Sequence, residues 1–227
     1  EIKMFEEIYE ALIAGGAYNT ILKGLWITLK ISFFSVILGS VLGAGICALR
    51  MSKVKIFSIM ARIYISVLRG SPLTMLLMLL YYCVFASTSL DAIYVAVITF
   101  GLSTAAYVAE MLRSAIKAVN RREAEAALTL GFNKLQTLRY VVIPQTMRIA
   151  KPVYQSTIIN MIQWTSVVGY VTITDLTRVI NNISSRTMQP LLLIVTGIIL
   201  YILIAYVVSG IFALTDMLNA KKRQGGR

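Results

Sequence analysis

The sequence predicts an all-α integral membrane protein with five transmembrane helices and a helical loop on the cytoplasmic side. Apolar residues make up 58% of the 227 residues, against roughly 45–50% in soluble domains, and the mean hydropathy is +0.76. The apolar residues form stretches that reach the ~20 residues that a bilayer-spanning helix needs. Basic residues gather in alternate connections, which is typical of cytoplasmic segments.

One transmembrane domain is expected over residues 23–217, followed by a basic cytoplasmic tail at 218–227. The connection after the first span and the segment after the third are also basic, so both should be cytoplasmic and the N-terminus external. The predicted spans are about 23–49, 56–86, 91–113, 149–171 and 190–215.

Glycine and proline predict two local features of the spans. Gly39 and Gly43 form a small-xxx-small pair in the first span, which lets another helix approach closely. The second span contains "RGSP" at 69–72. Pro72 has no backbone donor, so a kink or break is expected there.

Residues 1–22 are predicted to be an external amphipathic segment. Phe5, Ile8, Leu12 and Ile13 recur at helical spacing, which favours a helix at the membrane surface. The stretch lacks the charged and apolar regions of a signal peptide. Because the chain begins with Glu1, we expect it to come from a longer protein, with another domain in front as one option.

Composition argues against several functional classes. The net charge of +12 comes without a basic run interleaved with aromatic residues, so nucleic acid is not an expected partner. The chain has no histidine, which disfavours metal and cofactor sites and an intramembrane hydrolase. Cys47 and Cys83 each lie in an apolar run and are predicted to be buried.

The polar segment 118–145 has the pattern of two short helices joined by a glycine. Good helix formers run from Glu125 to Leu130, Gly131 suits a left-handed C-cap, and Asn133 suits an N-cap. Pro144 should end or kink the helix before the next span. Ala126, Ala127 and Leu128 could meet a partner's groove; the alternative is a loop that packs on its own domain.

The motifs resemble the permease subunits of ATP-binding-cassette (ABC) importers, specifically the polar amino-acid branch. The EAA motif of that family corresponds to Glu125, Ala126, Ala127 and Gly131, followed by "VVIPQ" at 141–145. Other matching pieces are "GLWITLKIS" (24–32), "YISVLRGSPL" (64–73), "AAYVAEMLRSAIKAV" (105–119) and "TSVVGYVTITDLTR" (165–178). Two departures are "RE" at 122–123, where the family often has Gly-Gln, and "QW" at 163–164, where it often has Lys-Asp.

The resemblance implies a type I importer fold and a set of partners. The EAA loop would dock on a cytoplasmic ABC ATPase dimer, a second permease subunit would complete the pathway, and an external or periplasmic solute-binding protein would deliver amino acid. The chain has no G-x-x-x-x-G-K-[ST] motif, so a separate subunit must hydrolyse ATP. The implied location is the bacterial inner membrane.

Arg69 and Glu110 are the ionisable groups hardest to place at a membrane edge, and intramembrane charges usually serve function. Arg69 could hold the carboxylate of an amino acid and Glu110 its ammonium, while the break at Gly70 would free backbone groups. Three alternatives remain open. The two side chains could pair with each other, Glu110 could pair with Arg113 on the same helix, or Glu110 could lie close enough to the cytoplasmic edge to stay hydrated.

Thr165 and Ser166 match a Thr-Ser pair of the family and could donate hydroxyls to a ligand, or could instead bond between helices. Trp164 stands where the family can have aspartate, so a basic substrate would lose a counter-charge. This favours a neutral or less polar substrate, or a site held by a sister subunit. A passive channel or scaffold is the competing functional class.

Overall fold

The computed structural model describes residues 17–188 and 190–224, and all regular structure in them is helical. This confirms the all-α fold class. The predicted surface helix with Phe5 and Ile13 falls largely on residues 1–16, outside the described part.

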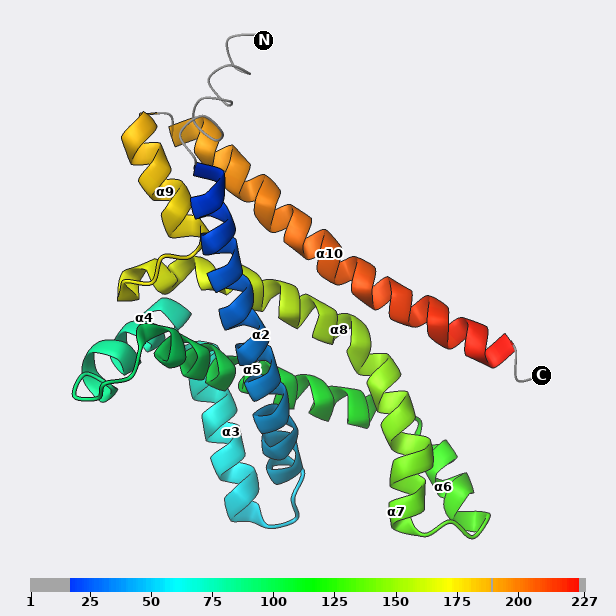
Figure 1. The fold of residues 1–227 in the computed structure, drawn as a ribbon. Coiled ribbons are helices and arrows are strands. Elements are labelled where there is room, and N and C mark those ends of the chain that lie inside the picture. Colours follow the sequence, from blue (N-terminus) through cyan, green and yellow to red (C-terminus); the bar gives the residue numbers. More distant parts are fainter. Residues whose placement is uncertain (1–16, 189, 225–227) are drawn as a thin grey trace.

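Helices α2 (Ala17–Arg50) and α5 (Ala92–Ala118) form the centre of the fold and cross in Figure 1. A Cβ atom at Gly39 would lie 2.6 Å from Thr104 Cβ, and one at Gly43 would lie 2.7 Å from Val108 Cβ. The predicted close approach is therefore confirmed, because side chains of the partner helix occupy the space that these glycines leave.

The predicted break at "RGSP" is also confirmed. Helix α3 (Lys55–Gly70) ends before Pro72, and α4 (Leu73–Leu79) continues at an angle of 106° through a π-helical turn, Leu80–Val84. Cys47 is buried, but Cys83 in this turn is exposed. The prediction of burial is therefore wrong for Cys83. Tyr81 of the same turn packs against the core, so Cys83 lies on the outer face of this helix.

The loop segment folds into α6 (Arg121–Thr129) and α7 (Lys134–Thr137), at the lower right of Figure 1. A π-helical turn, Leu138–Val142, joins α7 to α8 (Ile143–Trp164). The helix thus passes through Pro144 and does not end there. Pro144 stands in the first turn of α8, where a missing backbone donor is tolerated.

Helix α8 ends in a 3₁₀ helix, Thr165–Val171, which leads to α9 (Leu176–Thr187). One face of α9 is buried against α2 and α10 (Pro190–Gln224) through Leu176, Val179, Ile180 and Ile183. Figure 1 shows α10 diverging from α8 toward the C-terminus. Only 11% of its most apolar window is buried within the chain, so most of it must face lipid or another subunit.

Three helical stretches are long and apolar enough to cross a membrane: Ala17–Arg50, Ala92–Ala118 and Leu193–Leu218. The bent pair Lys55–Gly70 and Leu73–Val84 meets the same test when taken together. Helix α8, with Pro152 inside it, is not among them. The integral-membrane class is supported, while the count of five spans stays a prediction.

Candidate functional site

The loop between α5 and α8 has the predicted helix, glycine turn and helix. Gly131 has φ +91°, and two amide hydrogen bonds close the end of α6, from Gly131 N to Leu128 O (3.1 Å) and from Phe132 N to Ala127 O (3.1 Å). This is a Schellman motif. A capping box between Asn133 and Gln136 then starts α7, with both hydrogen bonds at 2.9 Å.

The loop has one face on its own domain and one face open. Ala127 and Thr137 are buried within the chain, whereas Leu130 is 82% exposed and Leu135 is 72% exposed. Glu125 is exposed, and its one ion pair among residues 17–188 and 190–224 is with Arg121, at 3.6 Å. One side of the loop thus packs on its own domain, as one of the two alternatives predicts. Docking on a partner stays a prediction for the other side, where the leucines are exposed.

The loop is tied directly to α8. Gln145 Nε2 donates to Glu123 Oε2 at 2.5 Å, and α6 packs on the π-helical turn that continues into α8. A displacement of α6 would therefore be passed to the start of α8.

The structure brings Arg69 and Glu110 to one pocket of about 400 Å³. The end of α3 supplies Arg69, α5 supplies Glu110, Tyr107 and Ser114, and α8 supplies apolar side chains and Thr157. A pocket of this size can hold a small solute.

The two charged groups have different partners. Glu110 forms a two-point ion pair with Arg113, one helical turn away. Within the described residues Arg69 has no carboxylate partner, and its Cζ lies 5.2 Å from the centroid of the Tyr107 ring. Of the alternatives left open by the sequence, the Glu110–Arg113 pair is the one that forms.

The other residues predicted for the substrate site do not line this pocket: Gly70, Trp164, Thr165 and Ser166. The Trp164 ring lies 5.1 Å from that of Tyr107, so Trp164 borders the same aromatic group as Arg69. Thr165 is fully buried and its hydroxyl donates to Ile162 O at 2.6 Å, within its own helix. Ser166 is exposed, and Gly70 has open space around its Cβ position.

Tyr107 was not among the residues predicted from the sequence. It links Arg69 to Trp164 and lines the pocket. The signal was present, because Tyr107 precedes Glu110 by three residues and so shares its helix face.

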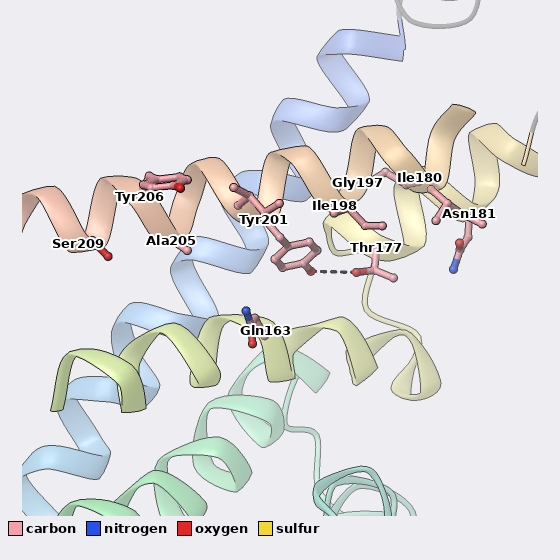
Figure 2. Close-up of a pocket in the computed structure, with 12 residues that line it drawn as sticks. Gln163, Thr177, Ile180, Asn181, Gly197, Ile198, Tyr201, Ala205, Tyr206 and Ser209 are labelled. Atoms are coloured by element: carbon pink, nitrogen blue, oxygen red, sulfur yellow. Dashed lines mark hydrogen bonds between the residues drawn. The ribbon is translucent and has the colours of Figure 1, made fainter. Parts of the chain in front are cut away.

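A second pocket, of about 450 Å³, lies between the ends of α8, α9 and α10 (Figure 2). The hydroxyls of Thr177 and Tyr201 meet across it at 2.9 Å, with Gln163 below them. Most of its wall is apolar.

Asp175 anchors this corner of the molecule. Its buried carboxylate caps α9 by accepting from the Arg178 amide (3.0 Å) and the Thr177 amide (3.2 Å). Burial raises the pKa of the Asp175 carboxyl, and the backbone amides that bond to it oppose this effect.

The fold is a set of long apolar helices around a small charged pocket, and helix α8 connects this pocket to a loop outside the helical core. This arrangement is typical of a membrane-embedded transport subunit. The chain belongs to the family of binding-protein-dependent transport system inner membrane components, whose family profile matches residues 35–221.

Individual relatives agree with this assignment. The probable amino-acid ABC transporter permease protein YckA of Bacillus subtilis (strain 168) is 33% identical over 219 residues, covering 96% of this chain and 95% of YckA. The histidine/lysine/arginine/ornithine permease HisM of Salmonella typhimurium is 28% identical and covers 93% of this chain and 94% of HisM. The resemblance inferred from the motifs is confirmed.

A solved structure supports the fold as well. A chain of an amino acid ABC transporter crystallised with histidines superposes with a TM-score of 0.82 at 30% identity. The superposition covers 91% of this chain and 97% of that one.

Proposed function

We propose that this chain forms half of the translocation pathway for an amino acid in the bacterial inner membrane, with its N-terminus outside. The observation that carries the proposal is the small pocket where Arg69, an intramembrane cation without a carboxylate partner among the described residues, meets Glu110. The printed names of YckA, HisM and the solved structure, which are of amino-acid transporters, support the substrate class.

Within this pocket we assign the substrate carboxylate to Arg69, whose guanidinium can donate two parallel hydrogen bonds. Glu110 would receive the ammonium while Arg113 holds its carboxylate in place. Ser166 and Gly70 do not line the pocket in this structure, so they would reach the substrate only after a movement of their segments. Buried Thr165 would shape the end of α8.

Trp164 and Tyr107 make the wall next to Arg69 aromatic. Such a wall offers apolar surface and no counter-charge for a basic side chain, so we assign a neutral amino acid as the substrate.

The driving force would come from a cytoplasmic ABC ATPase dimer seated on α6 and the Gly131 turn. Glu125, Ala126 and Leu128 are exposed and available for contact, together with Leu130. Ala127 is buried, so its role would be to seat α6 on the domain. The Glu123–Gln145 hydrogen bond would pass the movement of α6 to α8 and the pocket.

Further partners complete the proposed importer: a second permease chain, identical or not, and an external or periplasmic solute-binding protein, either separate or fused in front of residue 1. The weakly buried α10 offers a large apolar surface for a second subunit or for lipid.

The decisive experiment measures ATP hydrolysis by the reconstituted complex of permease, ATPase and candidate binding protein, screened across the amino acids. We expect stimulation by one or a few neutral amino acids, and no stimulation when Arg69 is replaced by alanine. Stimulation by lysine or arginine in preference to neutral amino acids would contradict the substrate assignment.

A loop deletion separates the importer from a passive channel. Removal of residues 120–135 should abolish ATP-driven uptake, whereas a channel would still conduct. The subtler variants Glu125→Lys and Leu130→Asp should weaken capture of the ATPase subunit in a pull-down. Met188→Asp, at another highly exposed apolar residue (84%), is the control and should leave capture unchanged.

A further inference from the structure

A cavity larger than the Arg69 pocket adjoins it. The cavity measures about 1000 Å³ and lies between α2, α5, α8 and α10. Met111 and Ala150 line both this cavity and the Arg69 pocket and form the wall between them. Its walls are mostly apolar, with side chains such as Ala44, Val108, Met147 and Phe212. Part of the acyl chains of a lipid molecule would fill it.

The polar groups inside this cavity are already paired with one another. Lys151 donates to Phe212 O (3.1 Å), to Thr215 Oγ1 (2.7 Å) and to Asp216 Oδ1. These three bonds use all three hydrogens of the ammonium. The Tyr154 hydroxyl lies 2.7 Å from Ser40 Oγ, which bonds to Val36 O at 2.6 Å. Among the described residues, Asp216 is the one carboxylate that lines this cavity, and Lys151 neutralises it.

Arg148 is the exception. It lines the cavity, is exposed, and takes part in none of the three ion pairs found in residues 17–188 and 190–224. Two carboxylates share a pocket with it. Glu123, in a smaller adjoining pocket, accepts a hydrogen bond from Gln145. Asp216, in the cavity itself, is paired with Lys151. A guanidinium with free donors at the edge of an apolar cavity suits a ligand with an anionic end and an apolar body.

The position of Arg148 fits the level of lipid headgroups. It lies one turn after Pro144 and directly before the predicted fourth span at 149–171, on the side predicted to be cytoplasmic. Basic pockets between transmembrane helices on this side bind anionic headgroups, and guanidinium binds phosphate in a two-point geometry.

We propose that this cavity is a binding site for an anionic phospholipid, with the phosphate on Arg148 and an acyl chain between Met147 and Phe212. The lipid would rest on α8 directly beyond the coupling loop. It would also fill the gap beneath α10, which is otherwise bridged there by the Lys151–Asp216 ion pair.

Native mass spectrometry of the complex with its ATPase subunit tests the headgroup contact. The complex is stripped of lipid and titrated with phosphatidylglycerol or with phosphatidylcholine. Wild type should prefer phosphatidylglycerol, and Arg148→Gln should weaken its binding about tenfold, as for one lost charge-assisted interaction. Arg62→Gln, an exposed arginine of α3 that does not line the cavity, should bind as wild type.

A cavity-filling variant tests the acyl part independently. Ala44→Phe should weaken phosphatidylglycerol binding while Arg148 is intact, whereas Ala48→Phe, one turn further along α2 and outside the cavity, should not. Millimolar inorganic phosphate should fail to displace the lipid. Equal binding by wild type and Arg148→Gln, equal binding by the two alanine variants, or full displacement by phosphate would overturn the proposal.

Discussion

Helix α5 has two faces with opposite properties. Toward α2 it is packed so closely that glycine is the only residue that fits at two positions of α2, opposite Thr104 and Val108. Toward α3 and α8 it carries Tyr107 and Glu110 into a pocket of about 400 Å³. The same helix is thus rigidly fixed on one side and open on the other.

The difference indicates which parts can move. Helices α2 and α5 form a unit whose relative shift would force atoms into contact, so movement within it is unfavourable. Helix α8 borders the open face, and its first turn is hydrogen-bonded to α6 through Gln145 and Glu123. A movement that opens or closes the pocket is therefore expected at α8, with α2 and α5 as the fixed frame.

The largest effect is expected on the packed face. Gly39→Leu and Gly43→Leu should prevent recovery of folded protein, because even the first added carbon would lie 2.6 or 2.7 Å from a carbon of α5. Overpacking costs about 1–3 kcal/mol and occasionally more. Yield of monodisperse protein in detergent and its thermal unfolding measure the effect.

Gly45→Leu is the matched control for these two variants, since a Cβ atom there meets nothing within 4 Å. It should be recovered at wild-type yield. If all three variants behaved alike, the close contact of α2 with α5 would not be what fixes the frame.

The open face should respond in transport and not in folding. Arg69→Ala removes a cation–π contact worth about 0.5–1 kcal/mol at exposed sites, so the unfolding temperature should change little. If Arg69 holds the substrate carboxylate, the variant also loses two hydrogen bonds of about 1.5–3 kcal/mol each. Because about 1.4 kcal/mol corresponds to a factor of ten, uptake should fall by about 100-fold or more. Arg62→Ala, on the same helix, should transport normally, and a loss of uptake in both would point to a general effect of charge.

Glu110 and Arg113 provide a finer test of the open face. If Glu110 receives the substrate ammonium, Glu110→Gln should raise the apparent KM about tenfold, as loss of one charge-assisted bond would. Arg113→Gln should raise it less, because Arg113 only holds the carboxylate. Equal effects of both variants on KM, together with equal losses of stability, would mark the pair as structural.

Much of the fold could be predicted from the sequence, since it depends on local rules. The small-residue spacing at Gly39 and Gly43, the proline after Gly70 and the glycine at 131 each act within a few residues. Helix α9 could also have been predicted: Asp175 is a good N-cap, and the apolar residues 176, 179, 180 and 183 follow helical spacing.

The pocket was harder to predict, because its geometry depends on which helices meet. Sequence alone could not choose between Arg69 and Arg113 as the partner of Glu110, since one pairing is between helices and the other within a helix. It also could not show that Ala127 faces inward while Leu130 faces outward, which follows from how α6 lies on the π-helical turn before α8.

The smallest effect is expected where α9 joins the frame. The Leu176 amide donates to Thr28 Oγ1 of α2 at 3.2 Å, and Asp175 caps the helix. Asp175→Ala should lower the free energy of unfolding by about 0.5–2 kcal/mol, as for loss of an N-cap. Asp175→Asn keeps an acceptor oxygen and should lose less.

The dependence of stability on pH separates the cap from the charge of Asp175. Burial raises the pKa of this carboxyl in the folded chain above its ordinary 3.8, so the folded state holds its proton more firmly than the unfolded state does. The stability that this supplies is complete below pH 3.8 and is lost as the pH rises through the folded-state pKa. Wild type should therefore lose unfolding free energy over that window, and Asp175→Asn should lose less. Parallel pH profiles for the two proteins would show that the carboxyl titrates as it does in the unfolded chain, and that α9 is joined to the frame by the cap alone.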